Sequence, residues 1–211
     1  MDVTKTRKIG QAIESASDKV LSIGVVGSRS LSYEVADHVG NIVEDVLERG
    51  FHIASGGAIG ADQFVIERLI HLGRSESCTV YSAWKRYDGF PLKVRAMMRQ
   101  FKDYGGHILW GMSGDKSNDL GVKLALLSRN QKLVEACHGI VAFITGGSRG
   151  TIYTIKEATK RRMPLVVFPI SSLALKSSCD PGLLPALPHV KWVPLRCGGC
   201  WDGSFKAVYL R

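Results

Sequence analysis

Short apolar runs rich in β-branched residues alternate with longer amphipathic stretches along most of this chain. The run from Val20 to Val26 is typical of a buried strand, and the stretch from Tyr33 to Arg49 repeats apolar residues at helical spacing. The same patterns predict strands at 51–54, 79–83, 107–110, 140–144 and 165–168, and helices at 61–72, 92–101, 117–127 and 151–162. This alternation over short connections predicts an α/β fold with a doubly wound, mostly parallel sheet and helices on both faces.

One further helix is predicted from a local signal. Ser128 followed by Gln131 has the form of a capping box, in which the two side chains satisfy free N–H groups at a helix start. We therefore expect a helix from Ser128 to Cys137, separate from the helix that precedes it.

The character of the chain changes after Pro169. Residues 170–211 hold two of the four tryptophans and three of the five cysteines. We divide the chain into a ligand-binding domain at 1–170 and an irregular C-terminal extension at 171–211, with a small β element at Ala207 to Leu210.

Composition limits where such a chain works and what it binds. With 45% apolar and 22% charged residues the chain can build a core, and no run approaches the length of a membrane span. The polar N-terminus and the odd number of cysteines predict a cytoplasmic protein with no membrane partner. The net charge of +9 favours polyanionic partners or phosphorylated ligands.

Three glycine-rich turns each follow a predicted strand and lead into a helix. They are Gly24–Arg29, Ser55–Asp62 and Thr145–Thr151. Ligands of open α/β sheets bind outside the carboxyl ends of the strands, where helix N-termini present unpaired N–H groups. Glycine lets the backbone approach a phosphate closely. Tight turns alone would also need glycine, but three such turns with Ser, Thr and Arg favour a phosphate cradle.

The candidate ligand-binding residues come from these turns and from the Ser128–Gln131 segment. They are Gly27, Ser28, Arg29, Ser55, Gly56, Gly57, Gly60, Asp62, Arg129, Asn130, Gly146, Gly147, Ser148, Arg149, Gly150 and Thr151. Hydroxyl groups would donate hydrogen bonds, and the arginines would pair with phosphate oxygens. Two roles are considered for Asp62. In the first, its charge complements the dipole at the helix N-terminus. In the second, it binds a ribose hydroxyl of the ligand or orients Arg29 or Arg129.

Four segments, in order, resemble the DprA/SLOG group of Rossmann-like proteins. This group includes DNA-processing protein A (DprA/Smf) and the Lonely Guy (LOG) phosphoribohydrolases. Gly27-Ser28-Arg29 resembles its first turn, and Ser55–Asp62 resembles the Ser-Gly-x-Ala-Arg-Gly-x-Asp motif. Ser128–Gln131 resembles its Arg-Asn-Arg helix start, and Gly150–Thr154 with Ala158 resembles its last turn. The resemblance covers roughly residues 20–170 and implies a Rossmann-like, nucleotide-binding fold.

The chain departs from the pattern of this group at three positions. Ile59 and Gln131 stand where the DprA motifs carry arginines, and Thr154 stands where the LOG enzymes carry a catalytic glutamate. Glu157, three residues or one helical step beyond Thr154, is a weak candidate for the missing acid/base group.

Two other groups of residues can be explained either by a ligand-binding function or by ordinary packing and solvent exposure. Arg95, Arg99 and Lys102 share one predicted helix face, beside the aromatic residues Trp84, Tyr87, Phe90 and Tyr104. Cations beside aromatic rings suit the binding of single-stranded nucleic acid. The alternative is that the cations form a solvated helix face and the aromatic residues pack in the core. Cys179, His189, Cys197 and Cys200 could form a zinc site, although their spacing fits no common finger and free thiols are the default.

These observations lead to three hypotheses. The first, which the resemblance favours, is a non-enzymatic protein that binds single-stranded DNA in DNA processing and recombination, with a recombinase partner and a homodimer or higher homo-oligomer. The second is a binder or sensor of a free nucleotide or nucleotide derivative. The third is a LOG-like nucleoside 5′-monophosphate phosphoribohydrolase. None requires a cofactor beyond a bound nucleotide or phosphate.

Overall fold

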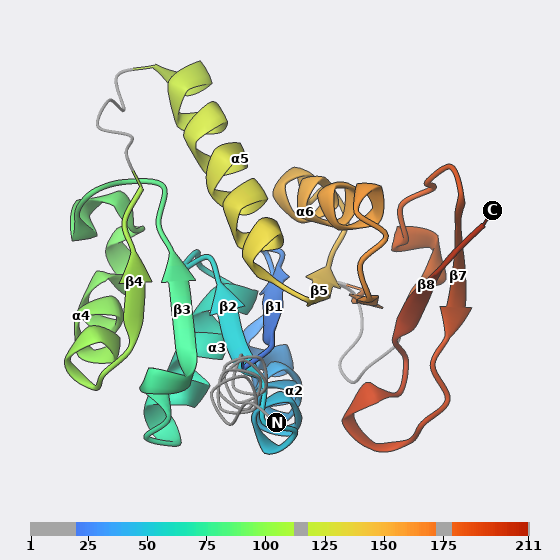
Figure 1. Cartoon of the computed structure of the whole chain (residues 1–211), viewed down its shortest axis with the longest axis horizontal. Helices are drawn as coiled ribbons and strands as arrows, with labels where there is room; N and C mark the ends of the chain where they lie inside the picture. The colour runs from blue at the N-terminus through green and yellow to red at the C-terminus, as the bar shows by residue number, and fades with distance from the viewer. Residues whose placement is uncertain (1–19, 112–117, 172–178, 211) are drawn as a thin grey trace, which may run out of the picture.

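The computed structural model describes residues 20–111, 118–171 and 179–210. Within them, eight strands form one sheet in the order β4-β3-β2-β1-β5-β6-β8-β7 (Figure 1). The parallel strands are β1 Ser22–Gly27, β2 His52–Ser55, β3 Cys78–Tyr81, β4 His107–Leu109, β5 Gly139–Ile144 and β6 Leu165–Pro169. Two antiparallel strands, β7 Val190–Pro194 and β8 Phe205–Tyr209, complete it. The predicted α/β fold class is confirmed.

Helices cover both faces of the sheet (Figure 1). The α-helices are α2 Ala36–Glu48, α3 Ala61–His71, α4 Arg95–Asp103, α5 Asp119–Ala136 and α6 Arg149–Lys160. Short 3-10 helices are η1 Tyr33–Val35, η2 Ser75–Ser77, η3 Tyr87–Gly89, η4 Leu92–Val94, η5 Pro181–Leu183 and η6 Gly199–Trp201. None of the helices in the described ranges combines the length and the apolar character that a membrane span needs.

Two apolar cores lie on opposite faces because successive strand residues point to opposite sides. Val25 packs with buried residues of α2, α3 and α4, whereas its neighbour Val26 packs with buried residues of α5 and α6. The helices are thereby fixed against the sheet, and their N-termini are held at the rim where the parallel strands end.

The strand order reverses between β1 and β5. From β1 the chain builds outward through β2, β3 and β4, then returns through α5 to place β5 on the other side of β1. Ligands of doubly wound sheets bind at such a reversal. The first and third glycine-rich turns, which follow β1 and β5, meet here.

The predicted helix boundary at Ser128 is wrong. α5 runs without interruption from Asp119 to Ala136, and Asn118 caps it by accepting a hydrogen bond from the Gly121 N–H at 2.6 Å. Once that start is capped, each added residue gains a backbone hydrogen bond, so a second start at Ser128 offers nothing. Arg129 and Asn130 therefore project from the body of a helix, and their backbone N–H groups are not at a helix start.

The last part of the chain extends the sheet. The small β element expected at 207–210 is present as β8, which pairs with β6, and β7 is an additional strand that the sequence pattern did not predict. β7 alternates only weakly between apolar and polar residues and ends on Pro194. Such a strand depends on its partner rather than on its own pattern.

Candidate functional site

A crevice of about 920 Å³ opens at the strand reversal. Gly27, Arg29 and Ser30 of the first turn line one side, and residues 146–151 of the third turn line another. The second turn contributes Ala58 and its last residue, Asp62, which lies in the first turn of α3. Residues of α5, Arg129 and Asn130 among them, complete the lining. The volume is within the range of small-molecule sites, and the turns predicted to converge do converge.

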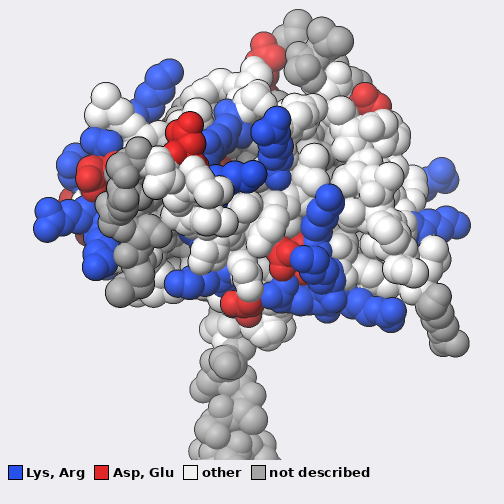
Figure 2. Space-filling model, turned by 90° about the horizontal axis from the view of Figure 1, so that it is seen from above, with Lys and Arg blue, Asp and Glu red and all other residues white. Residues whose placement is uncertain are grey.

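Positive charge dominates this crevice. Five cationic side chains line it, against two carboxylates, Asp62 and Asp119. The cations are Arg29, Lys123, Arg129, Arg149 and Lys156. Figure 2 looks down on the rim toward which the parallel strands of Figure 1 point, and it shows Lys and Arg atoms around its centre and edges. The excess of positive charge favours an anionic ligand.

The start of α6 forms one wall of the crevice. Gly147 has a φ of 81°, and Ser148 at the N-cap makes no side-chain capping bond to the helix. The Ser148 hydroxyl instead lies 2.8 Å from the Thr151 hydroxyl. An N-terminus without a side-chain cap retains N–H groups that an anion can accept, and the helix dipole favours negative charge there.

Arg129 lies at the centre of the site because Gly56 leaves room for it. A Cβ built on Gly56 would overlap Arg129 Nη1 and would lie 2.6 Å from Asp62 Oδ2. The Arg129 side chain is 9% exposed and that of Asp62 is 7% exposed. Their closest atoms, Nη1 and Oδ2, are 3.8 Å apart, which is an ion pair without a hydrogen bond.

Asp62 holds Arg129 in position, which is one of the two roles expected of it. Asp62 Oδ2 accepts a hydrogen bond from the Ala58 N–H at 3.2 Å, which fixes the carboxylate beneath the guanidinium. Burial raises the pKa of the Asp62 carboxyl above its ordinary value, and the nearby Arg129 charge opposes that rise. Arg129 is therefore the nearby charge that favours the ionised form of this buried carboxylate.

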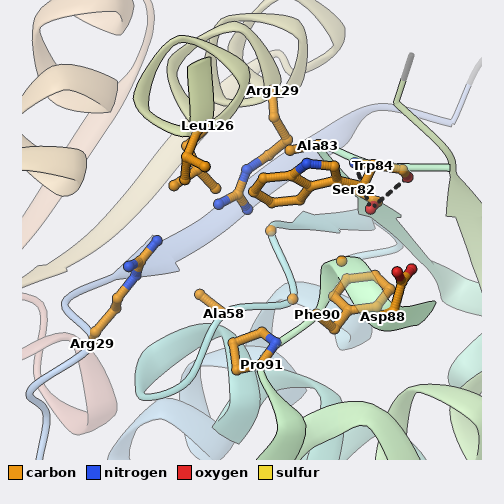
Figure 3. Close-up of a pocket in the computed structure, with 14 residues that line it drawn as sticks. Arg29, Ala58, Ser82, Ala83, Trp84, Asp88, Phe90, Pro91, Leu126 and Arg129 are labelled. Atoms are coloured by element: carbon orange, nitrogen blue, oxygen red, sulfur yellow. Dashed lines mark hydrogen bonds between the residues drawn. The ribbon is translucent and has the colours of Figure 1, made fainter. Parts of the chain in front are cut away.

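A second cavity of about 300 Å³ lies on the other side of Arg129. The aromatic side chains of Trp84 and Phe90 line it. The residues that it shares with the crevice are Arg29, Ala58, Val122, Leu126 and Arg129. Figure 3 shows Arg129 extending from α5 beside the Trp84 ring, with Arg29 pointing in from the opposite side. Gly57 and Pro91 also line it. This cavity suits a flat, partly apolar group.

Comparison with known proteins decides the family. The sequence model of the family described as "DNA recombination-mediator protein A" matches residues 13–180. The chain belongs to this family. A search of curated proteins returned no match.

Solved structures of DNA processing protein A share the fold of this family member. The protein from Streptococcus pneumoniae is 23% identical, with a TM-score of 0.58 over 78% of this chain and 53% of that chain. The protein from Helicobacter pylori, whose structure is described by its single-stranded DNA binding mode, is 20% identical, with a TM-score of 0.58 over 74% and 68%. The molybdenum cofactor binding protein from Rippkaea orientalis is 14% identical, with a TM-score of 0.51 over 72% and 77%. The match thus spans about half the length of the pneumococcal protein.

Three residues of the DprA motifs identified in the sequence support the backbone and do not line either cavity. The Ser28 hydroxyl accepts from the Thr145 N–H at 2.9 Å, and the Ser55 hydroxyl donates to the Val25 carbonyl at 3.0 Å. Gly60, with a φ of 80°, lies where a Cβ would overlap the Ser28 carbonyl oxygen. These contacts join the turns to one another, so we assign the three residues to shaping the site.

Ile59 and Gln131, which replace arginines of the DprA motifs, place no cation in either cavity. Ile59 packs against the core formed with α2, α3 and α4. Gln131 donates a hydrogen bond to Glu135 Oε1 at 2.9 Å on the exposed surface of α5. The crevice therefore takes its positive charge from other positions, including Lys123 and Lys156, which the motifs did not single out.

Glu157 does not line the crevice and has other partners. Its carboxylate accepts from Lys160 Nζ at 2.6 Å and from Arg161 Nη1 at 3.0 Å. The hydrogen bond from Lys160 holds the pKa of Glu157 below its ordinary value, with Arg161 adding to the effect. A carboxylate kept ionised by two cations is poorly suited to donate a proton.

The C-terminal cysteines are not arranged as a metal site. Across residues 20–111, 118–171 and 179–210, no group of three or more His, Cys, Asp and Glu side chains could hold a metal ion. Cys179, His189, Cys197 and Cys200 are thus not brought together, and all cysteines are free thiols. Cys179 packs instead against Gly203, where a Cβ would lie 2.5 Å from its sulfur.

Proposed function

We propose that the crevice and the adjoining cavity bind single-stranded DNA and that the chain acts in DNA processing. The observation that carries the proposal is the position of Arg129, which lies between a cationic crevice and an aromatic cavity. A nucleotide of a single strand has the same two parts, a charged phosphate and a flat base. A phosphate in the crevice would place its base against Trp84 and Phe90.

Family membership supports this proposal. The recombination-mediator family is named for its role with DNA, and the Helicobacter pylori protein is described as binding single-stranded DNA. A recombinase partner and assembly into a homodimer or higher oligomer are further parts of the proposal, which rest on the family alone.

The salt dependence of binding tests the proposal. We expect the logarithm of affinity for an oligothymidylate of about 20 nucleotides to fall with the logarithm of salt concentration, and the crevice cations alone to contribute about −2 to −3.5 to the slope. This contribution corresponds to about three to five phosphates neutralised by the cations that line the crevice. Fluorescence anisotropy at several salt concentrations measures it.

The same measurement separates DNA from a free nucleotide, which would also fit the two cavities. An affinity that barely changes with salt would contradict the DNA proposal. So would thermal stabilisation by nucleoside phosphates without any binding of oligonucleotides, because a ligand stabilises only the fold that binds it.

A further inference from the structure

The rim carries a third recess, beyond the aromatic cavity and near the β4 edge of the sheet. It is an open basin of about 540 Å³ lined by Lys85, Arg86, Tyr87, Asp88, Arg99 and Trp110. Residues 85–88 follow β3 and Trp110 follows β4, so the basin lies on the same rim as the crevice. We infer that this basin is a second stacking site, over which a bound single strand continues after it leaves the aromatic cavity. The inference rests on the proposed function.

Three aromatic rings connect the cavity to the basin. Phe90 lines the cavity and Tyr87 and Trp110 line the basin. The ring centroids of Phe90 and Trp110 are 5.9 Å apart, and those of Tyr87 and Trp110 are 5.0 Å apart in an edge-to-face arrangement. Trp110 is 37% exposed, whereas Phe90 is 4% exposed. The wall between the two recesses is therefore aromatic, with an accessible ring on the basin side.

The basin is positively charged. Lys85, Arg86 and Arg99 are exposed, and no carboxylate within the described residues forms an ion pair with any of them. The Arg99 guanidinium carbon lies 5.4 Å from the centre of the Tyr87 ring. Asp88 is the one carboxylate in the lining, so cations outnumber it. Cations beside an exposed aromatic ring are what single-strand sites use to hold the backbone and stack a base.

The basin is held in shape before any ligand binds. Arg95 donates from Nε to the Phe90 carbonyl at 3.0 Å and from Nη2 to the Asp88 carbonyl at 2.8 Å, which fixes the turn that carries Tyr87. The Gly111 N–H donates to the Trp84 carbonyl at 3.2 Å, which joins the segments after β3 and β4. Arg95 is therefore a structural residue of the basic helix face, whereas the exposed Arg99 lines the basin.

Two oligothymidylates test the inference, one of about four nucleotides that fills the crevice and cavity, and one of about 20 that reaches the basin. We expect Trp110→Ala to weaken binding of the long strand about tenfold, a loss typical of one stacked base, and to leave the short strand unchanged. Tyr104→Ala is the matched control, because Tyr104 is 55% exposed and follows α4 at the opposite rim. It should change neither affinity.

A second variant guards against misfolding of Trp110→Ala. The double variant Lys85→Gln/Arg86→Gln changes two exposed side chains and should reduce the salt slope for the long strand by about 1.4. Lys191→Gln/Lys206→Gln, which removes two exposed charges from β7 and β8, is its control.

Wild-type affinity and slope for the long strand in both basin variants would overturn the inference while leaving the proposed function intact. Failure of the wild-type protein to bind either strand would instead overturn the proposed function.

Discussion

Arg129→Ala is expected to weaken binding of single-stranded DNA by about 30-fold or more and to lower the free energy of unfolding by about 2–3 kcal/mol. Binding falls because the variant loses the cation shared by the crevice and the aromatic cavity. Stability falls because Asp62, 7% exposed, loses the charge that compensates its own. Anisotropy and urea unfolding measure the two effects separately.

The loss of stability should depend on pH. Without Arg129, burial raises the pKa of Asp62 further above its ordinary value of 3.8. A folded-state pKa above the unfolded value means that stability is fully present below the unfolded pKa and decreases as pH rises from there through the folded pKa. Arg129→Ala should therefore cost less stability near pH 4 than at pH 8. An equal cost at both values would contradict the coupling of the two residues.

A double variant separates the structural and the binding effects. Asp62→Asn removes the buried charge, so Arg129→Ala/Asp62→Asn should regain most of the lost stability. It should not regain DNA binding, because the guanidinium is still missing. Recovery of binding in the double variant would show that Arg129 acts only by supporting the fold.

Gly56→Ala is expected to reduce DNA affinity at least tenfold and, like Arg129→Ala, to cost about 2–3 kcal/mol of stability, because it separates the guanidinium from the buried Asp62 carboxylate. The added methyl group would occupy the position of Arg129 Nη1, so the guanidinium must move away from the junction of the two cavities. The methyl group would also lie 2.6 Å from Asp62 Oδ2, which is buried and hydrogen-bonded to the Ala58 N–H, so the carboxylate must shift as well. Binding isotherms and thermal unfolding of one preparation measure both quantities.

Gly40→Ala provides the matched control for this substitution. Gly40 lies in α2, on the face of the sheet that does not carry α5 and Arg129. A Cβ at Gly40 would be 3.3 Å from Arg68 Cδ. The control therefore also brings a methyl group close to an arginine, but far from the crevice. If Gly56→Ala binds DNA like Gly40→Ala, the position of the guanidinium does not determine affinity.

The sequence was sufficient to predict the convergence of the turns. Glycine-rich segments after strands must meet at one rim when the strands are parallel, so the places of Gly27, Arg29 and Ser148 followed from local patterns. The hydroxyls of Ser28 and Ser55 could not be assigned in the same way. Their partners, the Thr145 N–H and the Val25 carbonyl, are distant in sequence and are set by strand pairing.

The aromatic cavity could not be predicted from local sequence patterns either, because its lining comes from segments that are distant in sequence. Trp84 follows β3, Leu126 belongs to α5, and the two line one cavity only because α5 returns across the sheet to β5. The capping-box pattern at Ser128 was misleading because Asn118 had already capped the helix. A pattern of four residues does not show whether the helix that contains it begins further upstream.

The uninterrupted course of α5 has a consequence for how this protein can change its preferences. One rigid rod carries Arg129 together with Val122 and Leu126, which form part of the aromatic cavity. Any sliding or rotation of that rod moves the anion contact and the base enclosure at once. Under the proposed function, the contact to the phosphate and the enclosure of the base therefore both depend on the position of α5.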